Sequence, residues 1–201
     1  MPGERGRPRT FDIDAALDKA VEVFWKYGFQ DASMQELTQA MGLSKPSLYA
    51  AYGDKEALYL KALQRYAIAL VVRHGGALDE EPDGRRAISG FLKSMASMFA
   101  DPALPGGCFV VNGSADCGGL SMPPAVETAL RGAMQGSEVL LLERLERARR
   151  DGQLAAHAKP AELASLFMSI IAGMGVMAKS GADVNKLNTV IDSVMLAWPG
   201  G

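Results

Sequence analysis

The chain has 201 residues, which corresponds to one or two domains and suffices to bury a hydrophobic core without disulfides. Hydrophobic residues make up 48% and charged residues 22%, with 21 basic and 23 acidic side chains, so the composition excludes a disordered chain and an overall polycation. Any nucleic-acid binding must therefore be local. The longest apolar stretch, residues 166–178, is shorter than the ~20 residues of a membrane span, and residues 1–10 contain no hydrophobic signal segment. We therefore expect a cytoplasmic protein without membrane contact.

Apolar residues recur at helical spacing along nearly the whole chain, and the sequence shows no useful length of alternating strand pattern. This pattern predicts an all-α protein of about nine helices. The first helix is expected to begin after Asp12, a suitable N-cap, and to end at Gly28, because glycine readily adopts the left-handed conformation that ends a helix.

Two short helices are predicted next, separated by a tight turn. Ser33 and Glu36 form the pattern of a capping box at the start of the second helix, which ends near Gly42. Ser44 can cap the third helix, which ends at Gly53. The result is a helix, a glycine turn and a second helix.

The remaining two-thirds of the chain is predicted to be helical with proline- and glycine-containing loops between the helices. A loop is expected at residues 79–84 and another at 101–107. The predicted helices cover residues 55–74, 88–99, 108–115 (a short one), 124–151, 160–179 and 183–198.

The two short helices could form a helix-turn-helix, in which the N-terminal part of the second helix enters the DNA major groove. The small residues Ala40 and Gly42 would allow the helices to approach closely, and Lys45, Ser47 and Tyr49 would face outward. A helical hairpin without DNA-binding activity would show the same apolar pattern, so periodicity alone does not decide between the two.

Residues 10–62, above all the run TQAMGLSKPSLYAAYGDKEALYLKAL, resemble the N-terminal domain of the TetR family of bacterial transcription regulators. The likeness rests on the glycine-hydrophobic-serine turn, the Leu-Tyr pair and the Lys-Glu-x-Leu start of the fourth helix. It implies a three-helix DNA-binding domain at residues 10–55, preceded by a flexible basic arm at 1–9 and followed at 56–201 by a larger helical domain for ligand binding and dimerisation. It also implies a regulator and not an enzyme, without cofactor or metal.

The resemblance implies phosphate contacts for Ser33, Tyr49 and Lys55, and an approach to base edges for Lys45 and neighbouring residues. Ala50 stands where many family members carry longer side chains, so we expect few base-specific hydrogen bonds. The operator sequence would then be read through contacts with thymine methyl groups or through sequence-dependent DNA shape. The candidate DNA-binding residues are Arg5, Arg7, Arg9, Ser33, Ser44, Lys45, Pro46, Ser47, Tyr49, Ala50, Tyr52 and Lys55.

Arg5, Arg7 and Arg9 form a cationic arm that could lie in the adjacent minor groove; the alternative is a tail without specific contacts. With two or three arm arginines added to Lys45 and Lys55, a dimer could neutralise about 6–10 phosphates. Operator affinity would then fall by roughly 10³–10⁵ between 50 and 200 mM salt.

The resemblance also assigns the last two helices to a homodimer interface that forms a four-helix bundle, which predicts a near-palindromic operator. An ordinary intramolecular core is the alternative. The candidate interface residues are Leu163, Leu166, Phe167, Ile170, Ile171, Met174, Leu187, Val190, Ile191, Val194 and Trp198.

The middle helices are rich in methionine, a flexible side chain that suits either a core or a pocket for irregular apolar ligands. The resemblance favours a pocket whose small, mainly apolar effector releases a repressor from DNA, with Asn112 as its polar group. The candidate lining residues are Phe91, Met95, Phe99, Cys108, Val111, Asn112 and Met134.

Two other mechanisms stay open on the same scaffold. Cys108 or Cys117 could react with an oxidant, an electrophile or a soft metal, although no basic residue stands immediately beside either one. An architectural DNA binder without an effector is the other. An enzyme is not expected, because the two histidines, His74 and His157, belong to no catalytic motif.

Overall fold

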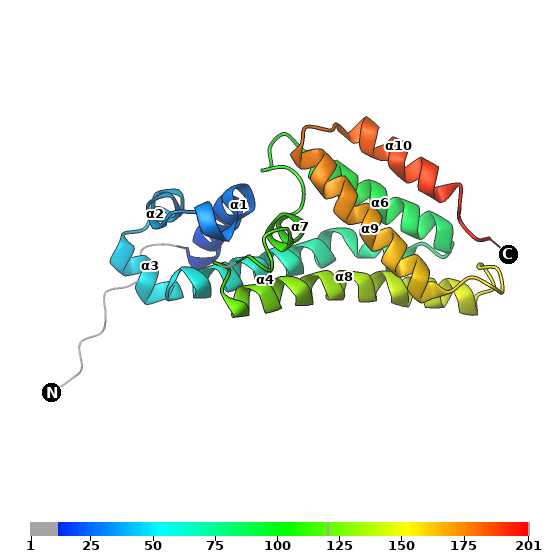
Figure 1. Cartoon of the computed structure of the whole chain (residues 1–201), viewed down its shortest axis with the longest axis horizontal. Helices are drawn as coiled ribbons and strands as arrows, with labels where there is room; N and C mark the ends of the chain where they lie inside the picture. The colour runs from blue at the N-terminus through cyan, green and yellow to red at the C-terminus, as the bar shows by residue number, and fades with distance from the viewer. Residues whose placement is uncertain (1–11, 120, 201) are drawn as a thin grey trace.

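The computed structural model describes residues 12–119 and 121–200, which form ten helical segments and no strand (Figure 1). This confirms the predicted all-α fold, with an N-terminal helix-turn-helix and a larger helical part after it. The segments are α1 (Ile13–Asp31), α2 (Met34–Met41), α3 (Lys45–Tyr52), α4 (Lys55–His74), α5 (Gly76–Glu80), α6 (Gly84–Phe99), α7 (Phe109–Ser114), α8 (Pro124–Arg150), α9 (Pro160–Lys179) and α10 (Val184–Met195).

Several predicted boundaries need correction. The helical geometry breaks at Gly28 as predicted, with a glycine φ of 74°, but one further turn follows and α1 continues to Asp31. Helix α6 begins at Gly84 and not at residue 88, and α10 ends at Met195 and not at residue 198. Residues 79 and 80 do not belong to a loop but close the five-residue helix α5, which begins directly after Gly75. Each of these differences concerns about one turn of helix, the scale on which helix ends are hardest to predict from sequence.

The predicted caps fix the start of each of the first three helices. The Asp12 carboxylate accepts hydrogen bonds from two backbone N–H groups of α1. The Ser33 hydroxyl accepts from the Glu36 N–H (3.1 Å), while the Glu36 carboxylate accepts from the Ser33 N–H (2.9 Å), which completes the capping box. These hydrogen bonds from Ser33 lower the pKa of Glu36. Ser44 caps α3 through the Ser47 N–H (3.3 Å).

Helix α4 connects the two parts of the molecule. Its N-terminal half packs against α1, and its C-terminal half packs against α6 and α8 (Figure 1). Helix α9 lies across α8 and α6, and α10 covers α6. A displacement of α4 would therefore be transmitted to both parts.

Six aromatic side chains join α1, α4 and α7, and we call them the aromatic row. Successive rings meet edge to face with centroids 4.9–5.4 Å apart, an arrangement that stabilises beyond the burial of area. All six are buried. The aromatic row consists of Phe24, Trp25, Phe29, Tyr59, Tyr66 and Phe109.

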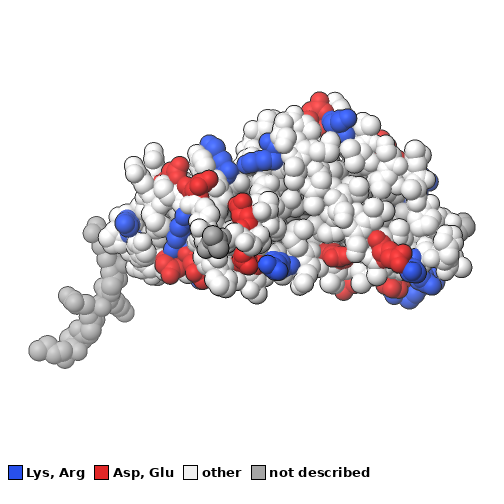
Figure 2. Space-filling view, viewed as in Figure 1, with Lys and Arg blue, Asp and Glu red and all other residues white. Residues whose placement is uncertain are grey.

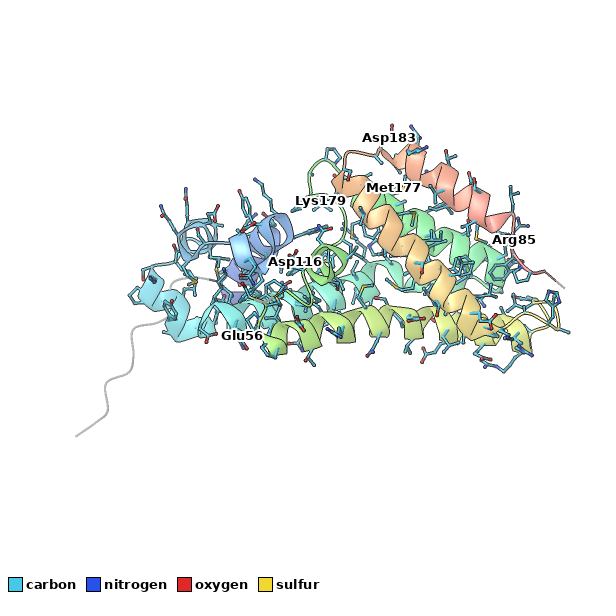
Figure 3. The ribbon with its side chains drawn as sticks, viewed as in Figure 1. Glu56, Arg85, Asp116, Met177, Lys179 and Asp183 are labelled. Carbon is cyan, nitrogen blue, oxygen red and sulfur yellow. The ribbon has the colours of Figure 1, made fainter. Side chains whose placement is uncertain are left out.

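Three hydrogen bonds add to this connection between the N-terminal helices and the larger part, and one of them runs from Gln30 Nε2 of α1 to the Ser121 carbonyl before α8. The Trp25 indole N–H donates to the Gly106 carbonyl (3.1 Å) in the loop before α7. Lys179, at the end of α9, extends toward α1 (Figure 3), and its Nζ donates to the Lys26 carbonyl (3.3 Å). The N-terminal helices are thus fixed to the rest of the chain by packing and by polar contacts.

We expect Phe109→Ala to lower the free energy of unfolding by about 3–5 kcal/mol, because it removes a fully buried ring between Tyr59 and Tyr66 and leaves a cavity. Urea denaturation at a fixed chain concentration measures the change. Val72→Ala, at a side chain that is 79% exposed, is the control and should stay within about 0.5 kcal/mol of the wild type. Similar values for the two variants would show that the aromatic row does not stabilise the fold.

Candidate DNA-binding surface and ligand cavity

Helix α3 presents the predicted recognition surface to solvent. Ser44, Lys45, Pro46 and Ala50 are exposed, and the Tyr49 side chain is 43% exposed. Leu48 lies on the opposite side of α3 and is fully buried. The helix is therefore held from beneath while its N-terminal turn and Tyr49 remain accessible, as a helix that enters the major groove requires.

Ser47 and Tyr52 are placed differently from the other residues of α3. The Ser47 hydroxyl lies 2.8 Å from the Ser44 hydroxyl and is half-buried. Tyr52 is buried, and its hydroxyl donates to the Ile13 carbonyl (2.7 Å) at the start of α1. The expectation of a DNA contact by Tyr52 is therefore wrong, because its side chain fixes α3 to α1 beneath the surface.

Lys55 and Ser33, two of the expected phosphate ligands, already have partners within the chain. The Lys55 ammonium donates to the Gln30 carbonyl (3.1 Å) and lies 4.9 Å from the centre of the Phe29 ring. Burial lowers the pKa of Lys55, and the nearby acidic groups Asp31 and Glu36 oppose that shift. An ammonium has three donors, so two remain for a phosphate. The Ser33 hydroxyl is exposed but donates to the Glu36 carboxylate (2.7 Å).

The predicted arm residues Arg5, Arg7 and Arg9 lie outside the described residues. On the face drawn in Figure 2, the described part of the N-terminal helices carries basic and acidic side chains side by side. Local positions such as Lys45 and Lys55, and not a broad basic patch on this face, therefore supply the positive charge at the DNA-binding end.

An apolar cavity of about 270 Å³ lies in the larger part, bordered by α4, α6, α7, α8 and α9. Five of the seven predicted lining residues border it, namely Phe91, Met95, Cys108, Val111 and Met134. The residues missed by the prediction come mainly from α4 and α8. They are Ala67, Leu70, Val71, Gly75, Val110, Ala133, Gly136, Ser137, Leu140, Met168 and Ile171.

Phe99 and Asn112 do not line this cavity, so the prediction is wrong for both. Phe99 is fully buried in the core. The Asn112 amide is directed to the preceding loop, where its Nδ2 donates to the Gly106 carbonyl (3.4 Å), and it supplies no polar group to the cavity. The missed α4 residues 67, 70 and 71 follow i, i+3, i+4 spacing, a signal of one helix face that was available in the sequence.

The two cysteines are free and differ in burial. Cys108 is buried at the cavity wall, where its sulfur accepts a hydrogen bond from the Tyr66 hydroxyl (3.5 Å). Burial raises the pKa of the Cys108 thiol. Cys117 is half-buried, and its pKa is raised first by burial and then by the Glu127 carboxylate, with Arg131 opposing. Both side chains are therefore held in the less reactive thiol form.

The predicted interface residues fall into two groups. Phe167, Ile171, Met174, Leu187 and Ile191 are buried within the chain itself, so they are not available to a partner and the intramolecular alternative describes them correctly. The accessible group is half-buried apart from Leu166, which is 43% exposed. It consists of Leu163, Leu166, Ile170, Val190, Val194 and Trp198.

Comparison with known proteins decides the family. Residues 16–62 match the model of "Bacterial regulatory proteins, tetR family", and residues 84–194 match "Tetracyclin repressor-like, C-terminal domain". The chain is 34% identical to the HTH-type transcriptional repressor ComR of Escherichia coli. The match extends over 196 residues, which are 97% of this chain and 92% of that protein. This chain belongs to the TetR family.

Two further relatives of this TetR-family chain agree. The HTH-type transcriptional repressor BdcR of Escherichia coli is 29% identical, over 90% of this chain and 86% of that protein. The solved structure of a cysteine mutant of the TetR family regulator CifR, in complex with 26-bp operator DNA, is 36% identical to this chain and superposes on it with a TM-score of 0.88. The superposition covers 96% of this chain and 100% of the CifR chain. The chain is therefore a DNA-binding transcription regulator and not an enzyme.

The two tyrosines of α3 give a matched test of the DNA-binding surface. Tyr49→Phe removes an exposed hydroxyl. We expect it to weaken binding of operator DNA by at least about tenfold, since the expected hydrogen bond to a charged phosphate would be lost in each subunit of a dimer. Tyr52→Phe should instead lower the free energy of unfolding by about 1 kcal/mol and leave the affinity of the folded protein unchanged. Fluorescence anisotropy and urea denaturation measure the two effects. The assignment fails if Tyr52→Phe is the variant that weakens binding.

Proposed function

We propose that this TetR-family chain is a homodimeric repressor that leaves a near-palindromic operator when a small, mainly apolar molecule enters the cavity. The observation that carries the proposal is the position of the cavity, which is lined by α4, the helix that also packs against the DNA-binding helices. The expected operator contacts are those of the exposed α3 residues, together with Lys55 and the N-terminal arm.

The size and lining of the cavity favour a small ligand. Its volume of about 270 Å³ lies just below the ~300–1,000 Å³ of typical ligand pockets. At ~30 Å³ for a water-sized group, it would hold about nine non-hydrogen atoms. The Ser137 hydroxyl donates to the Ala133 carbonyl (3.1 Å) within α8, so this polar side chain is already satisfied. An apolar ligand body therefore suits the cavity better than a polar one.

Helix α4 offers a route from the cavity to DNA. Ala67, Leu70 and Val71 border the cavity near its C-terminal end, whereas Lys55 at its N-terminus is bonded to the end of α1. A ligand that binds better to the conformer with misplaced recognition helices would shift the population toward it. The affinity for DNA would fall at most by the factor by which the ligand prefers this conformer over the DNA-binding one.

The surface of α9 supports a homodimer. Helix α9 is as long and as apolar as a membrane-spanning helix, yet only 33% of its most apolar segment is buried within the chain. Leu166, Gly173 and Val176 lie at i, i+7 and i+10 on its exposed side. A two-fold copy of this chain would cover that side in a four-helix bundle and allow close approach at Gly173. This use of α9 agrees with a cytoplasmic protein.

Cysteine chemistry is a second candidate mechanism, because Cys108 lies at the wall of the cavity and contacts Tyr66 of the aromatic row. An electrophile that entered the cavity would meet its sulfur. The raised pKa of the thiol opposes this mechanism, since the thiolate is the reactive form. An inducer response that persists in Cys108→Ser would exclude it.

The dimer interface is tested by placing the same charge at two exposed valines. We expect Val176→Arg to shift the protein toward monomers and to weaken operator binding by at least about tenfold, because a buried charge without a partner is costly at an interface. Val139→Arg, at a side chain of similar exposure on α8, should remain dimeric. Analytical ultracentrifugation separates the outcomes, and an intact dimer for Val176→Arg would place the interface elsewhere.

Selection of bound sites from random DNA with the purified protein tests the regulator itself. We expect a two-fold symmetric consensus, and an affinity for it that falls by about 10³–10⁵ between 50 and 200 mM salt if 6–10 phosphates are neutralised. Binding without sequence preference would instead support the architectural alternative. A flat salt response would contradict the assigned phosphate contacts.

A further inference from the structure

The apolar cavity has a buried end and an accessible end. Among the described residues that line it, those of α6, α7 and α9 are all buried, with Cys108 counted as the N-cap of α7. Those of α4 and α8 are all half-buried or exposed, with Gly75 counted as the C-cap of α4. The cavity therefore opens to solvent between α4 and α8, which lie side by side (Figure 1).

Short side chains leave room at this opening. Ala67 and Gly75 line the cavity from the side of α4, and Ala133 and Gly136 line it from the side of α8. Gly136 is exposed, and the space into which a Cβ atom would project from it is open. Val71, which lines the cavity from α4, is 48% exposed. Val71 and Gly136 therefore stand at the opening itself.

Large apolar side chains remain exposed next to the opening. Ile68 stands three residues before Val71 on α4, and Val139 stands three residues after Gly136 on α8, a spacing that makes neighbours on a helix surface. Both side chains are about half exposed, and the nearby Val72 is 79% exposed. Exposed apolar groups beside a cavity favour a ligand whose apolar part continues past the opening.

The interior of the cavity offers a ligand no free polar partner. None of the described lining residues is charged. The Ser137 hydroxyl already donates to the Ala133 carbonyl, and the Cys108 sulfur already accepts from the Tyr66 hydroxyl. A polar group of a ligand that entered the buried end would lose its hydrogen bonds with water without replacing them, which is costly. Such a group is therefore more stable at the opening, in contact with water.

We propose that the effector is a single-tailed amphiphile, a molecule with one alkyl chain and one polar end, which enters between α4 and α8 with the chain first and leaves its polar end at the opening. A passage between two packed helices suits a narrow chain better than a bulky ring. The inference rests on the proposed ligand-responsive function and names its ligand class. The volume of about 270 Å³ holds about nine carbons at ~30 Å³ for each group, so a longer chain would extend past the opening along Ile68 and Val139.

A series of 1-alkanols tests the open end with the wild-type protein. Isothermal titration calorimetry measures the affinity of 1-hexanol, 1-octanol and 1-undecanol for the full chain. Between the first two, we expect the affinity to rise roughly fourfold for each added CH₂, the usual gain when this group leaves water. We expect 1-undecanol to bind at least as tightly as 1-octanol, because its additional carbons can pass through the opening. Rejection of 1-undecanol, as by a closed cavity of this volume, or no binding of any alkanol would overturn the proposal.

The direction of entry is tested by 1,11-undecanediol, which carries a hydroxyl at both ends. We expect it to bind at least about tenfold more weakly than 1-undecanol, because one of its hydroxyls would have to enter the end that lacks a polar partner. Equal affinities of the two compounds would contradict a ligand that buries its alkyl end and keeps its polar end outside.

Two glycines of α8 give a matched test of the opening. Gly136 lines the cavity and Gly132, about one turn earlier, does not, yet both are exposed and have open space for a Cβ atom. We expect Gly136→Trp to weaken binding of 1-octanol by at least about tenfold, because the indole would fill the opening, and Gly132→Trp to bind it as the wild type does. Each variant replaces an exposed helical glycine by a better helix former, so both should fold. Unchanged binding in Gly136→Trp, or an equal loss in both variants, would overturn the proposal.

Operator binding, followed by fluorescence anisotropy with the same compounds, separates this inference from the proposed function. Binding of the alkanols in the expected order without release of DNA would support the amphiphile site and contradict the proposed release mechanism. Release of DNA by 1,11-undecanediol as effectively as by 1-undecanol would support the proposed function and contradict the amphiphile site.

Discussion

The edge-to-face packing of Tyr59 and Tyr66 against rings of α1 and α7 is the interaction on which the arrangement of the two parts depends. Tyr59 contacts Phe24, Phe29 and Phe109, so one side chain of α4 touches both neighbouring helices. Helix α7 lies so close to α4 here that a Cβ atom on Gly113 of α7 would come within 2.7 Å of the Tyr59 hydroxyl oxygen. A shift of α4 would therefore disturb its packing against α1 and α7. This packing, together with the hydrogen bonds that Trp25, Gln30 and Lys179 donate, connects the larger part to the DNA-binding helices.

Local chemistry made much of the fold predictable, whereas the assignment of residues to surface, cavity or core depended on contacts distant in sequence. The caps at Ser33 and Ser44 are local hydrogen bonds, and both are present as predicted. Tyr52, in contrast, lies four residues after the buried Leu48 and so on the buried face of α3, but its hydroxyl finds its acceptor, the Ile13 carbonyl, far away in the sequence. Asn112 failed as a cavity residue for the same reason, because its partner Gly106 belongs to a loop whose course helical periodicity does not reveal.

The lining of the cavity is almost entirely apolar. A ligand with an apolar body would therefore gain free energy by leaving water, at roughly 25 cal/mol for each Å² of apolar surface that it buries. The binding energy available to select one conformer is therefore concentrated at the C-terminal end of α4.

The length of α4 would convert a small tilt at this end into a larger displacement at the DNA-binding end. Its 20 residues span about 30 Å. A tilt of about 5° around Val71 at the cavity would displace the Lys55 end, about 24 Å away, by roughly 2 Å, which is most of the length of a hydrogen bond. Lys55 is bonded to the end of α1, and Tyr52 fixes α3 to the start of α1, so the recognition helix would follow that displacement. Because both recognition helices of a two-fold dimer would move relative to a DNA of fixed pitch, contacts would be lost at both half-sites together.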